Sequence, residues 1–402
     1  MKRPCMKSLN TAYAAVQGTY WMGFCVYTSY AAAYLQAVPY SNTELGLIMA
    51  LGNLLSVVLA PALSARIDRD ARVTPAKIIP VLLALQVCAY AALLCVPYRH
   101  PVSASAFVAC MAFSITVNPM NVKLYVDFAH RGDTIDFGFA RGFGSLAYVL
   151  LSVFLGRLIG ETGVKILPVA GLVLTGLQFA THANLCRYLP DGNGTAGRRV
   201  TEQAQGLPMR RFLSAHPRYV RLLAGIMLLF FAHNILINFM INIVENLGGN
   251  TTDMGYLNAF MAAVEIPVIM FFSKWFGKYD ARRILTIAFL VFTVKEIAIA
   301  FVPSIPLLYA SFLLQAPSFA LYTAAIVPYV DRNIPYSDGA KAQSLAASMS
   351  TAGAIFASIV GGFLYDHTSV FHTMLFACAV SAAGSVVAFS GLTRKTGTGL
   401  SG

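Results

Sequence analysis

The sequence predicts an all-α membrane protein with twelve transmembrane helices in two six-helix bundles and both termini in the cytoplasm. Composition is the first observation, because 57% of the 402 residues are hydrophobic and only 11% are charged, against roughly 25% charged in soluble domains. A mean hydropathy of +0.65 over the whole chain is the second. The third is the distribution of basic residues, which lie on alternate connections between the apolar runs.

Twelve apolar segments are candidate membrane spans, because a span needs about 20 mostly apolar residues. We place them at 13–37, 44–64, 77–97, 103–127, 137–159, 164–187, 219–245, 254–274, 284–303, 305–330, 341–365 and 369–391. The eleventh is the weakest, since residues 342–357 are mostly Ala, Ser, Gly and Thr. Small residues let helix backbones approach closely, so we predict a packed inner helix there.

The positive charges orient the chain. With the N-terminus inside, 23 of the 29 Lys and Arg residues fall on inner segments, and only Arg99, Arg157 and Lys165 fall on outer loops. This asymmetry predicts cytoplasmic termini and a multi-pass protein of the cell membrane. The net charge of +12 therefore reflects cytoplasmic loops, and we expect the lipid bilayer rather than nucleic acid as the partner. We expect a monomer.

A polar, glycine-rich connection at 191–208 divides the chain into residues 1–190 and 209–402. The halves repeat weakly. The second span begins at Glu44-Leu-Gly46 and the eighth at Asp253-Met-Gly255, and each ends in an acid–base cluster. Parallel repeats of this kind are typical of transporters that have a substrate site at the membrane midplane.

The loop after the second span carries a family resemblance. Asp68 and Arg72 are similar to the acidic and basic positions of the major facilitator signature, although Ser64 replaces its glycine. Asp136-Phe-Gly-Phe-Ala-Arg141-Gly-Phe-Gly-Ser145 resembles the start of helix five in the lactose permease and oligosaccharide:proton symporter branch. Residues 329–331, 342–344 and 361–366 resemble the helix ten to eleven region of that branch.

The resemblance implies the twelve-helix fold and a transport function without implying galactoside specificity. The carboxylate that pairs with the helix-five arginine in that branch would fall at Lys123, a base. The helix-ten His and Glu of its proton pathway fall at Gln315 and Ser318, and helix seven carries asparagines in place of aspartates.

Four charged residues within or near spans are candidates for proton coupling. Glu265 is central in the eighth span and has no basic residue within eight positions, so a carboxyl group there can cycle between neutral and charged forms. A carboxylate permanently paired with a base such as Lys295 is the structural alternative. Lys295 and Glu296 are adjacent in the ninth span, so we expect them not to pair with each other and at least one to face the cavity. Asp127 is the candidate partner of Arg141.

Several side chains are candidates for solute binding. Arg141 offers a planar fork of donors, whereas bases such as Lys123 at inner helix ends often only extend toward the interface. Asn234, Asn238 and Asn242 recur every fourth residue on the seventh span, where amides suit hydroxyl-rich ligands or hydrogen bonds between helices. Tyr27 and Tyr30 form an aromatic wall or simply pack in the core. The full set is Arg141, Asn234, Asn238, Asn242, Tyr27, Tyr30, Gln315 and Lys123.

The acid–base clusters at inner helix ends are candidate gating contacts: Asp68, Arg72, Asp280 and Arg283. We find no phosphate loop, metal set or nucleophile–base pair, so the sequence favours neither an ATP-driven pump nor an enzyme, and no cofactor is expected. It predicts a proton-coupled symporter of a small polar solute, a sugar or nucleoside. An exporter of drugs or sugars and a non-transporting receptor are the alternatives.

Overall fold

The computed structural model describes residues 6–70, 72–97, 99–189 and 207–392, and the regular elements in these ranges are all helical. The first group is α1 (Met6–Phe24), the π-helical turn η1 (Cys25–Ser29), α2 (Ala31–Ala37), α3 (Asn42–Arg69), α4 (Pro75–Cys95), α5 (Pro101–His130), α6 (Phe137–Thr162) and α7 (Ile166–Cys186). The second group is α8 (Met209–Ala215), α9 (Pro217–Asn238), α10 (Met240–Asn246), α11 (Thr251–Phe276), α12 (Ala281–Ala300), α13 (Ile305–Phe312), η2 (Leu313–Gln315), η3 (Ala316–Ala320), α14 (Leu321–Asn333), α15 (Tyr336–His367) and α16 (Val370–Gly391).

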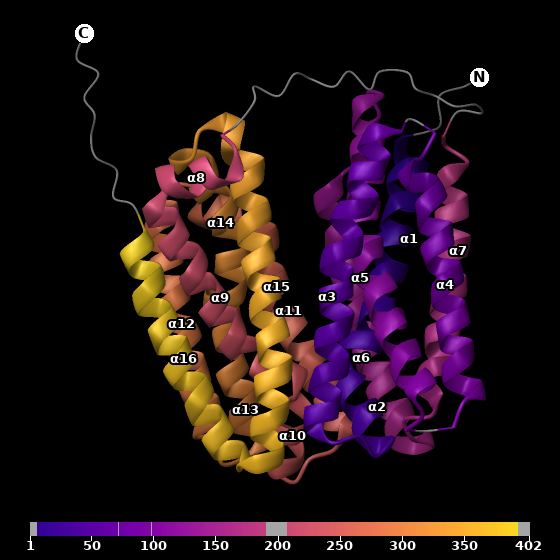
Figure 1. Ribbon diagram of the computed structural model, residues 1–402, viewed down its shortest axis with the longest axis vertical. Coiled ribbons are helices and arrows are strands. Elements are labelled where there is room, and N and C mark those ends of the chain that lie inside the picture. The colour runs from indigo at the N-terminus through magenta and orange to yellow at the C-terminus, as the bar shows by residue number, and fades with distance from the viewer. Residues whose placement is uncertain (1–5, 71, 98, 190–206, 393–402) are drawn as a thin grey trace.

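The two groups stand side by side as two helical bundles (Figure 1). We call them the N-half (6–189) and the C-half (207–392). One end of the molecule carries α8 and the other carries α2 and α10, and we name these the α8 end and the α10 end. Most of the predicted linker, residues 191–206, lies outside the described residues.

Ten helices among the described residues are long and apolar enough to cross a membrane. The other two predicted spans are helical but do not meet that measure. One is α1–η1–α2, in which the π-helical turn interrupts the helix, and the other is α12, which contains Arg282, Arg283, Lys295 and Glu296. The weak eleventh span is a continuous helix, α15, as the sequence predicted.

Local sequence explains where the key helices begin and where one is interrupted. Ser41 and Glu44 form a reciprocal capping box at the start of α3. The Asp280 side chain accepts the backbone N–H of Arg282 at the start of α12. Between α13 and α14, Pro317 has no backbone N–H to donate, and the helix passes through a 3-10 turn and a π-helical turn. Gln315 lies at this interruption, which is a common setting for functional residues.

The apolar core is shared between the halves only toward the α10 end. The largest cluster of buried side chains contains Tyr30 and Leu155 from the N-half together with Ile235 and Leu257 from the C-half. Two further clusters lie toward the α8 end, and each belongs to a single half: one includes Tyr13 and the other Tyr329. The described residues therefore close the interface between the halves at the α10 end.

Glycines bring helices of opposite halves together at this closed end. A β-carbon added to Gly46 of α3 would overlap the carbonyl oxygen of Ser358 on α15, and one added to Gly362 would overlap that of Asn42. The second crossing joins α6 and α11, where the α-carbon of Gly255 lies 3.0 Å from an ideal β-carbon on Gly156. Such close approach is typical of small residues at helix–helix contacts in membranes.

Candidate functional site

Arg141 of α6 and Glu265 of α11 belong to opposite halves and are near enough to interact electrostatically. The packing of their helices explains this. Gly156 meets Gly255 near the α10 end, and farther along an ideal β-carbon on Gly142 lies 3.8 Å from Met270 Sδ. This antiparallel register sets Glu265 opposite the turn of α6 that follows Arg141.

The Arg141 guanidinium is oriented within the N-half. It lies 3.8 Å from the centre of the Trp21 ring, and its Nη1 donates a 2.8 Å hydrogen bond to Ser145 Oγ. Stacking on an aromatic face suits a guanidinium better than an ammonium. The pairing of Arg141 with Asp127 stays a prediction. The sequence does not reveal the role of Trp21, because nothing in its spacing links α1 to α6.

Glu265 begins a chain of polar contacts inside the C-half. The Gln315 Nε2 atom donates a 2.8 Å hydrogen bond to Glu265 Oε1, and Lys295 Nζ donates a 3.0 Å hydrogen bond to Gln315 Oε1. Lys295 is therefore the nearby base that we predicted, but its contact with Glu265 passes through an amide. Gln315, placed by the interruption before α14, connects the partly buried carboxylate to a fully buried ammonium.

Two predictions about α12 are wrong. The Lys295 and Glu296 side chains are both fully buried, so neither faces a cavity. Lys295 Nζ also lies 3.6 Å from Glu296 Oε1, although the residues are adjacent. The helix alone would separate two neighbouring side chains, but both are long enough to bend into the same buried space. His233 of α9 completes this cluster, with Nδ1 3.0 Å from Lys295 Nζ.

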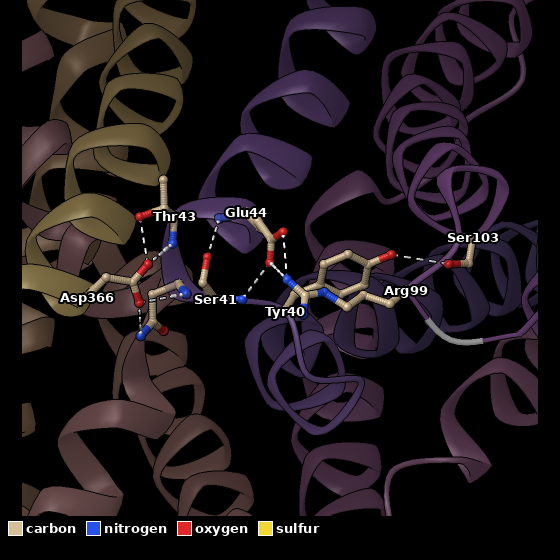
Figure 2. Close-up of polar contacts among 8 residues, drawn as sticks. Tyr40, Ser41, Thr43, Glu44, Arg99, Ser103 and Asp366 are labelled. Atoms are coloured by element: carbon tan, nitrogen blue, oxygen red, sulfur yellow. Dashed lines mark hydrogen bonds and ion pairs between the residues drawn. The ribbon is translucent and has the colours of Figure 1, made fainter.

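A carboxylate clamp joins the halves at the closed α10 end. Asp366, at the last turn of α15, accepts hydrogen bonds from the backbone N–H groups of Asn42 and Thr43, at 2.9 and 2.7 Å. It also accepts from the Asn42 amide and the Thr43 hydroxyl. Figure 2 shows Asp366 directed at the first turn of α3, with Glu44 turned toward Arg99. A helix N-terminus favours negative charge, so this contact stabilises the closed end.

The predicted asparagine stripe divides into three different environments. Asn242 belongs to the closed end, where its amide lies 2.7 Å from Gln36 and 3.2 Å from Asn42 of the N-half. Asn238 Nδ2 donates a hydrogen bond to Ser358 Oγ in the same half, and Asn234 Nδ2 donates to the backbone oxygen of Phe230 on its own helix. The stripe therefore includes the interhelical bonding that we kept as an alternative.

The two predicted tyrosines are core residues in this conformation. Tyr30 is fully buried and donates a 2.7 Å hydrogen bond to the backbone oxygen of Ser152, beside the Gly156–Gly255 crossing. Tyr27 is also buried. The packing alternative describes them better than an exposed aromatic wall does.

Lys123 forms an ion pair with an acid of α3 toward the α8 end. Its Nζ lies 2.9 Å from Asp68 Oδ1 and donates to the backbone oxygen of Ser64, so it joins α5 to α3 within the N-half. The other predicted gating residues lie at this end, in the loop after α3 and at the start of α12. The backbone N–H of Arg72 donates to Asp70, Asp280 caps α12, and the Arg283 side chain is exposed.

Residues 13–376 match the model of a protein family described as the MFS_1 like family. The chain belongs to this family. A maltose permease of Geobacillus stearothermophilus is 24% identical to this MFS_1-like protein over 355 residues, covering 86% of this chain and 85% of the permease. The uncharacterized transporter YwbF of Bacillus subtilis (strain 168) is 22% identical over 383 residues, covering 92% and 91%.

Solved structures share the fold of the MFS_1-like chain. The nucleoside transporter NupG superposes with a TM-score of 0.76 at 13% identity, covering 98% of this chain and all of NupG. A bacterial homologue of the human lysosomal transporter Spinster gives 0.69 at 14% identity, covering 97% and 95%. The predicted family and a multi-pass membrane location are confirmed, and the chain is a transporter of a small-molecule substrate rather than an enzyme.

Proposed function

We propose that this MFS_1-like transporter is a proton-coupled symporter of a small polar organic solute, a sugar or a nucleoside. The observation that carries the proposal is the Arg141–Glu265 pair, one charge from each half at a contact between α6 and α11. A solute bound between them touches both halves, so its binding can bias their relative orientation. Arg141 and Glu265 are the proposed solute-binding residues, with Gln315 beside them.

The proposed orientation places the α8 end in the cytoplasm and the closed α10 end outside. The excess of Lys and Arg on inner segments supports it. We further propose that α1–η1–α2 and α12 complete twelve spans, and that residues 1–190 rock against 209–402 around the site. Closure at the α10 end then corresponds to an inward-facing conformation, the state described for the Spinster homologue.

The chemistry of the pair supports a hydroxyl-rich solute. A guanidinium presents several donors in one plane, a carboxylate accepts hydrogen bonds from hydroxyl groups, and the Gln315 amide can do both. The Trp21 ring beside Arg141 offers an apolar face for a sugar ring or a base. A maltose permease and a nucleoside transporter among the similar proteins support the same classes.

Export is the second candidate function. Multidrug resistance protein 2 of Bacillus subtilis (strain 168) is 22% identical over 146 residues, which is 36% of this chain. The match covers about a third of either protein, so we rank export below symport.

Flux in proteoliposomes tests the proposal. Purified protein is reconstituted, a pH gradient is imposed with the acidic side outside, and uptake of labelled sugars and nucleosides is followed with and without a protonophore. We expect accumulation of one class that the protonophore abolishes. Accumulation that persists without a pH gradient would overturn proton coupling, and efflux driven by an inward proton gradient would favour export.

A further inference from the structure

Three side chains on one face of α1 form a series of hydrogen bonds that leads to the solute site. Tyr13, Gln17 and Trp21 recur every fourth residue, so their side chains lie one above another on the helix. Trp21 Nε1 donates to Gln17 Oε1 at 3.3 Å, and Gln17 Nε2 donates to the Tyr13 hydroxyl at 3.0 Å. Tyr13 in turn donates to the backbone oxygen of Asn121 on α5, at 3.3 Å. The series therefore connects the Trp21 indole to the backbone of a neighbouring helix.

The donors and acceptors of this series fit together in one direction. An indole nitrogen can only donate, so it faces the oxygen of the Gln17 amide. The amide nitrogen then faces Tyr13, whose hydroxyl accepts one hydrogen bond and donates another. Gln17 is 1% exposed and Tyr13 is fully buried. A buried amide that is hydrogen-bonded at both its oxygen and its nitrogen holds its partners in a defined orientation, because breaking either bond leaves a polar group unpaired.

The indole at the end of the series is the surface on which Arg141 lies. The guanidinium carbon is 3.8 Å from the centre of the Trp21 ring. The ring also lies over Gly144 of α6, where an ideal β-carbon would be 2.5 Å from Trp21 Cδ1. Trp21 and Arg141 are both partly exposed, whereas Gln17 is buried. Gln17 therefore acts on a bound solute only through the indole.

We propose that Gln17 is a positioning residue of the solute site. Its amide sets the plane of the Trp21 indole, and that plane sets the direction in which Arg141 presents its fork of donors. This role rests on the proposed function, in which Arg141 binds the solute. The alternative is that packing against Gly144 and the neighbouring rings holds the indole without help from Gln17.

Time-resolved fluorescence anisotropy of Trp21 tests the positioning without any solute. The protein has two tryptophans, so Trp275→Phe, at an exposed position of α11, leaves Trp21 as the single reporter. We expect Gln17→Met to add a fast local rotation of the indole to the slow tumbling of the protein. Gln86→Met is the matched control, because Gln86 is equally buried and donates its hydrogen bond to Ser114. An unchanged Trp21 decay in Gln17→Met would overturn the proposal.

Tyr13→Phe is a second variant that answers the same question if Gln17→Met does not fold. It removes the hydroxyl that accepts the hydrogen bond of the Gln17 amide and keeps the aromatic ring in the core. We expect the same fast rotation of Trp21 with a smaller amplitude. A Trp21 decay in Tyr13→Phe that matches the parent protein would show that packing alone holds the indole, and would refute the proposal.

A double-mutant cycle tests whether Gln17 acts through the indole. Uptake of labelled maltose and of labelled uridine, one disaccharide and one nucleoside, is measured in proteoliposomes. For the transported solute we expect Gln17→Met to raise KM about fivefold at an unchanged maximal rate, as the loss of one hydrogen bond predicts. In Trp21→Phe, which has no indole N–H, the same substitution should have no further effect.

The results separate the positioning role from the proposed function. An equal rise in KM from Gln17→Met in both backgrounds would refute an action through the indole. If the wild-type protein takes up neither probe, that result counts against the proposed function, and the anisotropy of Trp21 still decides whether Gln17 orients the indole.

Discussion

The Asp366 carboxylate at the end of α15 accepts the backbone N–H of Thr43 at the start of α3, 2.7 Å away, and so joins the two halves at the α10 end. With the Asn42 contacts, one side chain receives four hydrogen bonds from the first turn of a helix in the other half. Opening this end requires all four to break, whereas helix packing by Gly46 and Gly362 only needs the surfaces to separate. We therefore regard the Asp366 carboxylate clamp as the charged contact that holds this end closed.

The first prediction concerns this carboxylate clamp. Asp366→Asn keeps the shape, removes the charge and replaces one accepting oxygen by an NH2 donor, and charge-assisted hydrogen bonds exceed neutral ones by about 1 kcal/mol. We expect the amides of Asn42 and Thr43 to exchange with deuterium roughly five- to tenfold faster, measured by mass spectrometry of the peptide that begins α3. Asp253→Asn, at the start of α11 and within one half, is the control. Unchanged exchange in Asp366→Asn would mean that the other contacts between the halves hold this end closed without the Asp366 charge.

The second prediction concerns Arg141. Lysine cannot both stack flat on Trp21 and present a fork of donors, so Arg141→Lys should weaken solute binding at least tenfold while expression is preserved. Thermal shift against the transported solute measures the binding. Arg157→Lys, at the α10 end beside Tyr256, is the matched control. Normal transport by Arg141→Lys would leave Arg141 as a charge that only sets topology.

The third prediction concerns Glu265. Glu265→Gln imitates the protonated side chain and can still interact with Gln315, so it should bind solute and exchange it across the membrane. It should lose uphill accumulation driven by a pH gradient, and Glu265→Ala should be worse because it removes the hydrogen-bonding groups. Counterflow and gradient-driven uptake in the same proteoliposomes separate the two activities.

Two outcomes would contradict a coupling role for Glu265. If its carboxylate is a permanent structural partner of Lys295, Glu265→Gln should lower stability, and Lys295→Gln in the same chain should restore it. Full pH-driven accumulation by Glu265→Gln would exclude this residue from proton coupling. Glu296 and Asp127 would then be the remaining candidate carboxylates.

The fourth prediction concerns orientation. Accessibility tags placed after Gly402 and within 191–208 should both report the cytoplasm, and a tag near Asn250 at the α10 end should report the outside. Labelling of intact cells with a membrane-impermeant reagent makes the measurement. A C-terminal tag reached from outside would require an odd number of spans and would refute the twelve-span arrangement.

The sequence by itself determined the helical membrane class, the family and the approximate span positions. Apolar runs of about 20 residues and alternating basic loops are local features, because each segment must satisfy its own backbone hydrogen bonds in lipid. The sequence also identified Glu265, Arg141, Lys295 and Gln315 as candidates, since a charge or amide within an apolar run stands out without a structure.

Only the tertiary structure decided which of these side chains meet. Helical spacing predicted that Lys295 and Glu296 would diverge, but packing against α9 and the interrupted helix before α14 brings both into one buried cluster with His233. Trp21 reaches Arg141 and Asp366 reaches Thr43 across more than a hundred and more than three hundred residues of sequence, respectively. Periodicity describes one helix at a time, whereas these contacts depend on how helices of a bundle cross and on which end of the two halves is closed.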